Sequence, residues 1–125
     1  MGANPLSELK HKIDTELDAG AQALASGNAG RARVHARRAA SWAVGAYMQQ
    51  RDLAPGAKRG FEQLLFLRDS GLVSARNQQR LQHLTISLEK DDPEGESYWP
   101  LDVNLLDEAR ILADELLGDL SADSI

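Results

Sequence analysis

Residues 31–50 read RARVHARRAASWAVGAYMQQ, and this stretch decides the fold class. Its small side chains recur every three or four residues, the spacing of one helix face, whereas a strand alternates every second residue. The positions concerned are Ala32, Ala36, Ala39, Ala40, Ala43 and Tyr47. Small residues let another helix approach closely, so the stretch predicts either the central helix of a bundle or a seam for self-association. We expect this helix to span residues 29–50.

The segment before this helix has the same periodicity. A helix face is formed by Leu6, Leu9, Ile13, Leu17, Ala21 and Leu24. The pair Asn4-Pro5 is a favourable helix start, because asparagine caps free amides and proline needs no hydrogen-bond partner at the first position. Ser26-Gly27 ends this helix, and Asn28 is placed to cap the next one.

Three more segments follow the quoted stretch. We expect a third helix over 57–69 and a fourth that Ser74 caps and that carries Leu81, Leu84 and Leu88 on one side. Residues 89–100 contain two prolines, a glycine and a run of acids, which predicts a loop. Asp102 or Asn104 caps a last helix, which we expect to close at Gly118. The prediction is an all-α, up-and-down bundle of four to five helices.

The chain of 125 residues is long enough for one domain, with a predicted core over about 5–118 and a frayed tail over 119–125. It contains no cysteine, which excludes disulfides, thiolate zinc sites, iron–sulfur clusters and cysteine nucleophiles. No apolar run approaches the roughly 20 residues that span a bilayer, and residues 1–10 lack the pattern of a secretory signal. We therefore expect a cytoplasmic protein without a membrane partner.

Charge is distributed unevenly along the chain. Residues 1–62 carry nine basic and six acidic side chains, whereas residues 63–125 carry five basic and thirteen acidic ones. This asymmetry indicates either a basic face for an acidic partner, or attraction between two parts of the bundle or between two copies. The sequence pI of about 5.1 argues against a general nucleic-acid binder.

The candidate binding residues are four arginines and an aromatic side chain: Arg31, Arg33, Arg37, Arg38 and Trp99. In one interpretation the arginines form a solvated rim and pair with acids of the last helix, of the 89–96 loop, or of the first helix (Asp14, Glu16 or Asp18). In the other they bind a nucleotide or another small anion. Trp99 follows an acidic loop and either covers one end of the core or anchors a partner.

Several kinds of site are not predicted. Glu8 and His11 form a single carboxylate–imidazole pair, whereas a di-iron bundle needs two such pairs and further glutamates, so we expect no metal. Ser41 lies within a helical pattern rather than at a nucleophile elbow, and the glycines do not form a phosphate-binding loop. We expect no cofactor.

The chain resembles the HEPN superfamily of small helical bundles. The segment VHARRAASWAVGAYM is similar to the family's second helix, and residues 61–73 are similar to the helix and loop that follow it. Tyr98-Trp99-Pro100 and residues 103–117 look like the family's tyrosine–proline loop and closing helix. The resemblance implies a bundle of four or five helices, frequently homodimeric, with links to toxin–antitoxin pairs, nucleotidyltransferase partners and RNA cleavage.

Catalytic HEPN proteins carry an arginine, four to six further residues and a histidine, and they cut RNA without a metal. Arg76 and His83 match this spacing, and Asn77 follows the arginine as in many active members. The family's pair lies nearer to the loop before the closing helix, where residues 89–92 contain neither arginine nor histidine. The alternative is that Arg76 and His83 are surface residues on a polar face.

We therefore predict a non-catalytic HEPN-like bundle, homodimeric, that acts as a binding or accessory module for another protein or a nucleic acid. The small-residue seam and the arginines from Arg31 onward are its predicted binding surfaces. The alternatives are a metal-independent ribonuclease that uses Arg76 and His83, and a nucleotide or small-anion binder.

Overall fold

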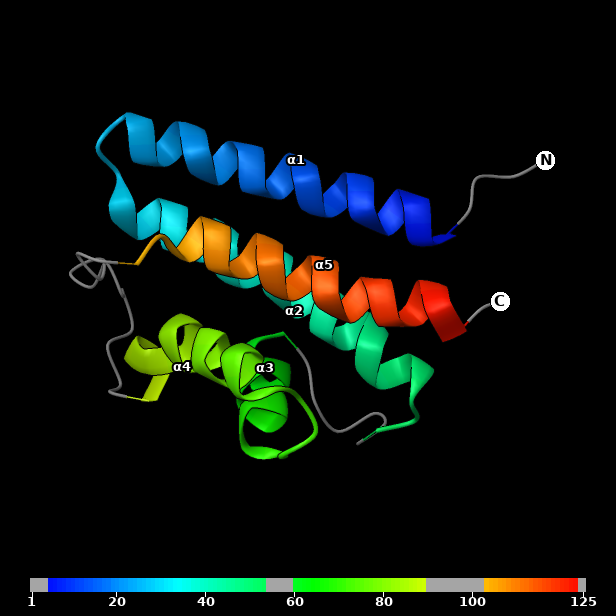
Figure 1. Ribbon diagram of the computed structural model, residues 1–125. Helices are drawn as coiled ribbons and strands as arrows, with labels where there is room; N and C mark the ends of the chain where they lie inside the picture. The colour runs from blue at the N-terminus through cyan, green and yellow to red at the C-terminus, as the bar shows by residue number, and fades with distance from the viewer. Residues whose placement is uncertain (1–4, 54–59, 90–102, 124–125) are drawn as a thin grey trace.

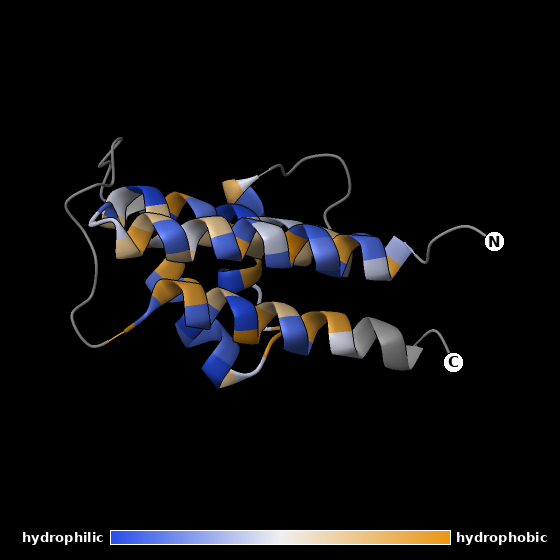
Figure 2. Cartoon of the chain, turned by 90° about the horizontal axis from the view of Figure 1, so that it is seen from above, coloured by the Kyte–Doolittle hydropathy of each residue, from blue (hydrophilic) through white to orange (hydrophobic). Residues whose placement is uncertain are grey.

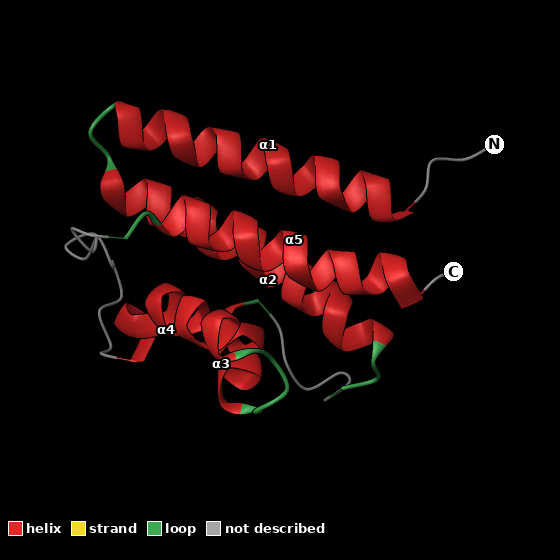
Figure 3. Ribbon diagram, viewed as in Figure 1, coloured by secondary structure: helices red, strands yellow, loops and turns green. Residues whose placement is uncertain are grey.

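The computed structural model describes residues 5–53, 60–89 and 103–123 (Figure 1). The helices in this part are α1 (Pro5–Ala25), α2 (Ala29–Gln50), α3 (Phe61–Asp69), α4 (Ala75–Glu89) and α5 (Leu105–Asp123). No strand occurs among the described residues (Figure 3). The prediction of an all-α bundle is confirmed.

The helices form two groups. α1, α2 and α5 lie along one another, and the α3–α4 hairpin packs against one side of them (Figure 1). α1 and α2 run in opposite directions because only Ser26-Gly27-Asn28 joins them. α5 runs in the same direction as α2 (Figure 1), whereas strict alternation through α3 and α4 would reverse it. The helices therefore do not alternate strictly up and down.

α2 is the central helix, because it contacts all four other helices. All five alanines of the predicted seam have no exposed surface, and Tyr47 is only 6% exposed. Of the two interpretations of the seam, the central helix is confirmed. A self-association surface at this seam is wrong, because the seam is covered by other parts of the same chain.

Side chains from the other helices complete the core around α2. They are Ile13 and Leu17 of α1, Leu64 and Leu67 of α3, Leu81 and Leu84 of α4, and Leu105, Leu112, Leu116 and Leu117 of α5. Every helix carries both hydrophobic and hydrophilic residues (Figure 2), as amphipathic helices at a core do. The helices pack closely at Gly20, where a Cβ atom would lie 2.5 Å from Leu106 Cδ2 and 3.0 Å from His35 Cβ.

Three of the predicted caps are confirmed. The backbone amide of Arg31 donates to Asn28 Oδ1 at 3.0 Å, and that of Asn77 donates to Ser74 Oγ at 3.2 Å. At the start of α5, Asn104 Oδ1 accepts from the amides of Leu106 and Asp107 at 2.9 and 3.2 Å. Each bond satisfies an amide that the first turn of a helix leaves free.

Two predicted helix ends are wrong. The third helix begins at Phe61 rather than residue 57, because Gly60 adopts a φ of 51°, which no helix contains. The last helix continues through Gly118 to Asp123, so residues 119–123 are helical instead of frayed. Gly118 marks no boundary, because glycine weakens a helix only modestly and Leu116 and Leu117 hold this turn to the core.

None of the described helices combines the length and the apolar composition that crossing a bilayer requires.

Candidate functional site

The arginines of α2 are separated by the fold. Arg31 and Arg38 are exposed, whereas Arg33 has no exposed surface and Arg37 is 4% exposed. Arg37 Nε donates a hydrogen bond of 2.6 Å to the backbone oxygen of Leu84 in α4. The predicted solvated rim is therefore wrong for Arg33 and Arg37, which are part of the interior and do not contribute to an exposed anion site.

The exposed part of this cluster is joined to α1. Glu16 Oε2 lies 2.7 Å from His35 Nδ1 and 3.1 Å from Arg38 Nη1. The predicted pairing of α2 cations with an acid of the first helix is confirmed at Glu16. Among the described contacts, the side chain of Arg31 has no hydrogen bond or ion pair, so it is the one arginine of the four that stays exposed without such a contact.

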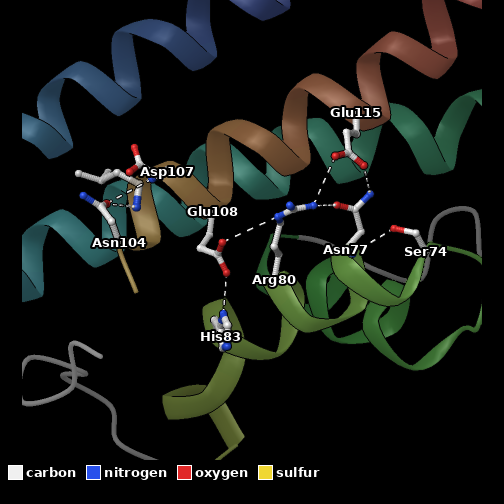
Figure 4. A network of polar contacts seen from close by, with 9 residues as sticks. Ser74, Asn77, Arg80, His83, Asn104, Asp107, Glu108 and Glu115 are labelled. Carbon is white, nitrogen blue, oxygen red and sulfur yellow. Dashed lines mark hydrogen bonds and ion pairs between the residues drawn. The ribbon is translucent and has the colours of Figure 1, made fainter. Parts of the chain in front are cut away.

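A polar network joins α4 to α5 (Figure 4). Asn77, Arg80 and His83 follow one another at three-residue intervals on α4, and they face Glu108 and Glu115, which are seven residues apart on α5. Both spacings keep side chains on one face of a helix. The network therefore fixes the register between the two helices.

The network contacts Glu108 at one end and Glu115 at the other. His83 Nδ1 lies 2.6 Å from Glu108 Oε1, and Arg80 Nε lies 3.8 Å from Glu108 Oε2. At the other end, Asn77 Nδ2 donates to Glu115 Oε1 at 3.0 Å, and Arg80 Nη1 lies 3.4 Å from Glu115 Oε2. Arg80 Nη1 also donates to Asn77 Oδ1 at 2.7 Å. Arg80 is thus the centre of the network.

The two residues of the predicted catalytic pair lie seven residues apart on α4 and have different surroundings. Arg76 is exposed and has no hydrogen bond or ion pair with the described residues, whereas His83 is 26% exposed and contacts Glu108. The arginine that shares a partner with His83 is Arg80. Sequence reasoning missed Arg80, Glu108 and Glu115, although their spacings on α4 and α5 were visible in the sequence.

The environment of His83 limits what it can do chemically. An ionised carboxylate only accepts hydrogen bonds, so Nδ1 of His83 is the donor in the contact with Glu108, and in a neutral imidazole Nε2 is then the acceptor. A histidine oriented in this way by a carboxylate is suited to general base catalysis. The same contact equally well serves to hold α4 against α5.

A surface cavity of about 350 Å³ adjoins the Glu115 end of the network. Its apolar wall is formed by Tyr47, Leu72, Val73 and Leu116, and its acidic rim by Asp114 and Glu115. Leu72 is 51% exposed, which is the highest value for a large hydrophobic side chain in the described part of the chain. This cavity could not be predicted from the sequence, because its walls come from α2, the loop before α4, Asn77 of α4, and α5.

The loop that carries Leu72 is held by hydrogen bonds. Ser70 Oγ donates to the backbone oxygen of Leu67 at 2.7 Å and accepts from the Leu72 amide at 3.1 Å. Gly71 has a φ of 75°, a conformation that glycine adopts without steric cost. Leu72 is thereby held in place at the edge of the cavity.

Arg68 connects the two helices of the hairpin beside this loop. Its Nε and Nη2 donate to the two carboxylate oxygens of Asp69 at 2.8 and 2.9 Å, and Nη1 donates to Thr85 Oγ1 of α4 at 3.3 Å. The hydrogen bonds and positive charge of Arg68 lower the pKa of Asp69 below its ordinary value, although burial opposes this slightly.

The exposed face of α5 continues the acidic rim. Asp107, Ile111, Asp114 and Gly118 recur at three- and four-residue intervals, and all four are exposed. Ile111 is 38% exposed. Within residues 105–123 the sequence holds six acidic side chains and one arginine. This face therefore combines an exposed aliphatic residue with unbalanced negative charge.

The predicted carboxylate–imidazole pair of α1, Glu8 and His11, lies on the surface. Both side chains are exposed, and the described residues contain no cluster of three or more histidine or acidic side chains that could hold a metal.

A second cavity of about 330 Å³ lies between α1 and α5, where Asp18, Leu24 and Arg110 are among its walls. Trp99 and the 90–102 segment lie outside the described residues.

Comparison of the chain with protein-family models, curated proteins and solved structures finds no match. The HEPN-like identity stays a prediction.

Proposed function

We propose that the chain is a non-catalytic, HEPN-like helical-bundle module that binds another protein. The observation that carries the proposal is the surface formed by the cavity at Leu72 and the exposed face of α5, called here the Leu72–α5 surface. Its residues are Leu72, Val73, Ile111, Asp114 and Glu115. Exposed aliphatic side chains next to a cavity and charged groups are typical of protein interaction sites.

A protein partner is favoured over a nucleic acid by the charges. Of the four α2 arginines predicted to contact phosphate, Arg33 and Arg37 are inside the chain and Arg38 lies next to Glu16. The cavity at Leu72 is bordered by carboxylates, which repel a phosphate backbone. The nucleotide and small-anion alternative loses its basis for the same reason, because only Arg31 of the four predicted arginines is left exposed without an ion pair to a described residue.

Self-association and a toxin–antitoxin pairing, which the HEPN resemblance implies, belong to the same proposal. A homodimer would have to use a surface other than the α2 seam, which is buried. Light scattering on the purified chain gives its mass in solution. A mass of two chains that persists on dilution supports the homodimer, and the mass of one chain contradicts it.

The experiment that tests the module function places a photoreactive amino acid at Leu72 in cells that naturally express the protein. Irradiation is expected to join the chain to a protein, which mass spectrometry identifies. The matched control carries the same group at Ala21, an exposed position of α1. Crosslinks to RNA alone, or the same crosslinks from both positions, would contradict the proposal.

The second candidate function is a metal-independent ribonuclease that uses Arg76 and His83. It is favoured by one observation, the carboxylate of Glu108 at 2.6 Å from His83 Nδ1, which orients the imidazole as in a general base. The test incubates cellular RNA with the purified chain, with His83→Ala and with Arg76→Ala. Cleavage by the wild type that both variants lose would support the ribonuclease, and no cleavage by the wild type would exclude it.

A further inference from the structure

The Leu72–α5 surface has a chemistry that restricts what can occupy it. The wall of the cavity is apolar at Tyr47, Val73 and Leu116, and Leu72 stands at its edge with half of its surface in water. An aliphatic side chain that entered this cavity would cover Leu72 and gain about 25 cal/mol for each Å² of apolar surface removed from water. An aliphatic side chain of the occupant would therefore be stabilised beside Leu72, although Ser74 and Asn77 also line the cavity.

The charge around the cavity restricts the occupant further. Asp114 is exposed and has no ion pair with any residue that the structure describes. The Glu115 side chain is 51% exposed even though it contacts Asn77 and Arg80. Asp107 is also exposed, but it lines the second cavity, which Asp18 and Arg110 line as well. A lysine or arginine of the occupant could therefore pair with Asp114 without displacing an existing contact.

The cations near the surface contact other side chains. Arg110 of α5 lies 2.8 Å from Asp14 of α1. Arg80 lies between Glu108 and Glu115, and only 13% of its side chain is exposed. The guanidinium of Arg51 lies over the ring of Tyr47 at 4.7 Å, and neither Arg51 nor Arg76 lines the cavity. The rim is therefore acidic, which disfavours an acidic peptide or RNA as occupant.

We propose that the Leu72–α5 surface binds a basic segment of a partner protein, in which an aliphatic side chain fills the cavity and a lysine or arginine side chain pairs with Asp114. Ile111 extends the apolar contact along α5. This inference rests on the proposed protein-binding function and names the chemistry of the partner. The loop that holds Leu72 is ordered by Ser70, so little conformational freedom is lost on binding.

The test selects short random peptides on the full chain and removes those that also bind the double variant Leu72→Ser/Asp114→Lys. The retained peptides are expected to be enriched in lysine or arginine together with leucine, isoleucine or valine. Both substituted positions are exposed, so the variants should keep the fold, which circular dichroism checks. Retained peptides without basic residues, or an empty selection, would overturn the inference.

Affinities of one selected peptide then separate specific pairing from general attraction. Leu72→Ser and Asp114→Lys are each expected to weaken binding by about tenfold, because one removes the apolar contact and the other places like charges together. Asp18→Lys makes the same charge change at the second cavity and is expected to alter affinity by less than about twofold. Equal loss for Asp18→Lys and Asp114→Lys would overturn the assignment of this surface, as would displacement of the peptide by oligouridine.

The outcomes also distinguish the inference from the proposed function. A protein that crosslinks from Leu72 but carries an acidic or uncharged contact segment would leave the module function standing and refute the basic partner. If no protein is crosslinked from Leu72, both the protein-binding function and the basic partner are refuted.

Discussion

Glu108 is the side chain through which α5 holds His83, and its replacement by alanine is expected to destabilise the fold by about 1–2 kcal/mol. The contact of 2.6 Å to His83 Nδ1 would be lost, together with the longer contact of 3.8 Å to Arg80. The free energy of unfolding is expected to fall, because the network holds α4 against α5.

The magnitude follows from the burial of the pair. A hydrogen bond to a charged group contributes about 1.5–3 kcal/mol, whereas an exposed ion pair contributes about 0–1 kcal/mol. The His83 and Glu108 side chains are 26% and 19% exposed, so their contact lies between these limits. Arg80 keeps its contacts with Glu115 and Asn77, so losing its longer contact with Glu108 costs little stability.

Asp107→Ala is the matched control for this substitution. Asp107 precedes Glu108 in the first turn of α5, where both acids interact favourably with the helix dipole by about 0.3–1 kcal/mol. The carboxylate of Asp107 has no ion pair within the described residues. The difference between the two variants therefore isolates the contacts with His83 and Arg80.

Urea and thermal unfolding, followed by circular dichroism, measure the effect. Glu108→Ala is expected to melt roughly 5 °C below Asp107→Ala, given the size of the chain. A double-mutant cycle with His83→Ala is expected to give a coupling free energy of about 1 kcal/mol. Equal melting of the two variants, or additive effects of Glu108→Ala and His83→Ala, would refute the structural role of the network.

Three further substitutions test other parts of the fold. Ala40→Glu buries a carboxylate at a position with no exposed surface, so it is expected to lower the melting temperature by at least about 10 °C. Its control, Ala21→Glu on the surface of α1, is expected to have little effect. Similar melting temperatures of the two variants would contradict the buried seam. Gly118→Ala is expected to stabilise the chain by about 0.5–1 kcal/mol in urea unfolding, because the new Cβ meets no atom within 4 Å and alanine favours a helix. Destabilisation would show that α5 does not continue through this position. Arg68→Met is expected to raise the pKa of Asp69 toward its ordinary value in an NMR pH titration, and an unchanged pKa would contradict the bidentate contact.

Local features of the fold could be predicted from the sequence. Asn28, Ser74 and Asn104 were identified as caps because a cap depends only on residues within one turn. The alanine spacing of α2 predicts close packing, either at the centre of a bundle or between two copies, and the burial of the seam decides for the centre. The end of α5 could not be predicted, because the glycine signal at Gly118 is outweighed by packing of neighbouring leucines against the core.

Features that depend on contacts between helices could not be predicted. The burial of Arg33 and Arg37 follows from how α4 lies against α2, and helical periodicity gives the direction of a side chain without saying what covers it. The choice of Arg80 over Arg76 as the partner in the network depends on the register between α4 and α5. The cavity at Leu72 likewise exists only once four segments have been assembled.

The most direct test of the central claim, that the protein binds a partner through the Leu72–α5 surface, is an amide NMR titration of the full chain with a selected basic peptide. The account predicts that the shifted resonances cluster in residues 70–74 and 111–118. Shifts that instead concentrate around the second cavity, near Asp18 and Leu24, or spread evenly over every acidic face, would contradict it.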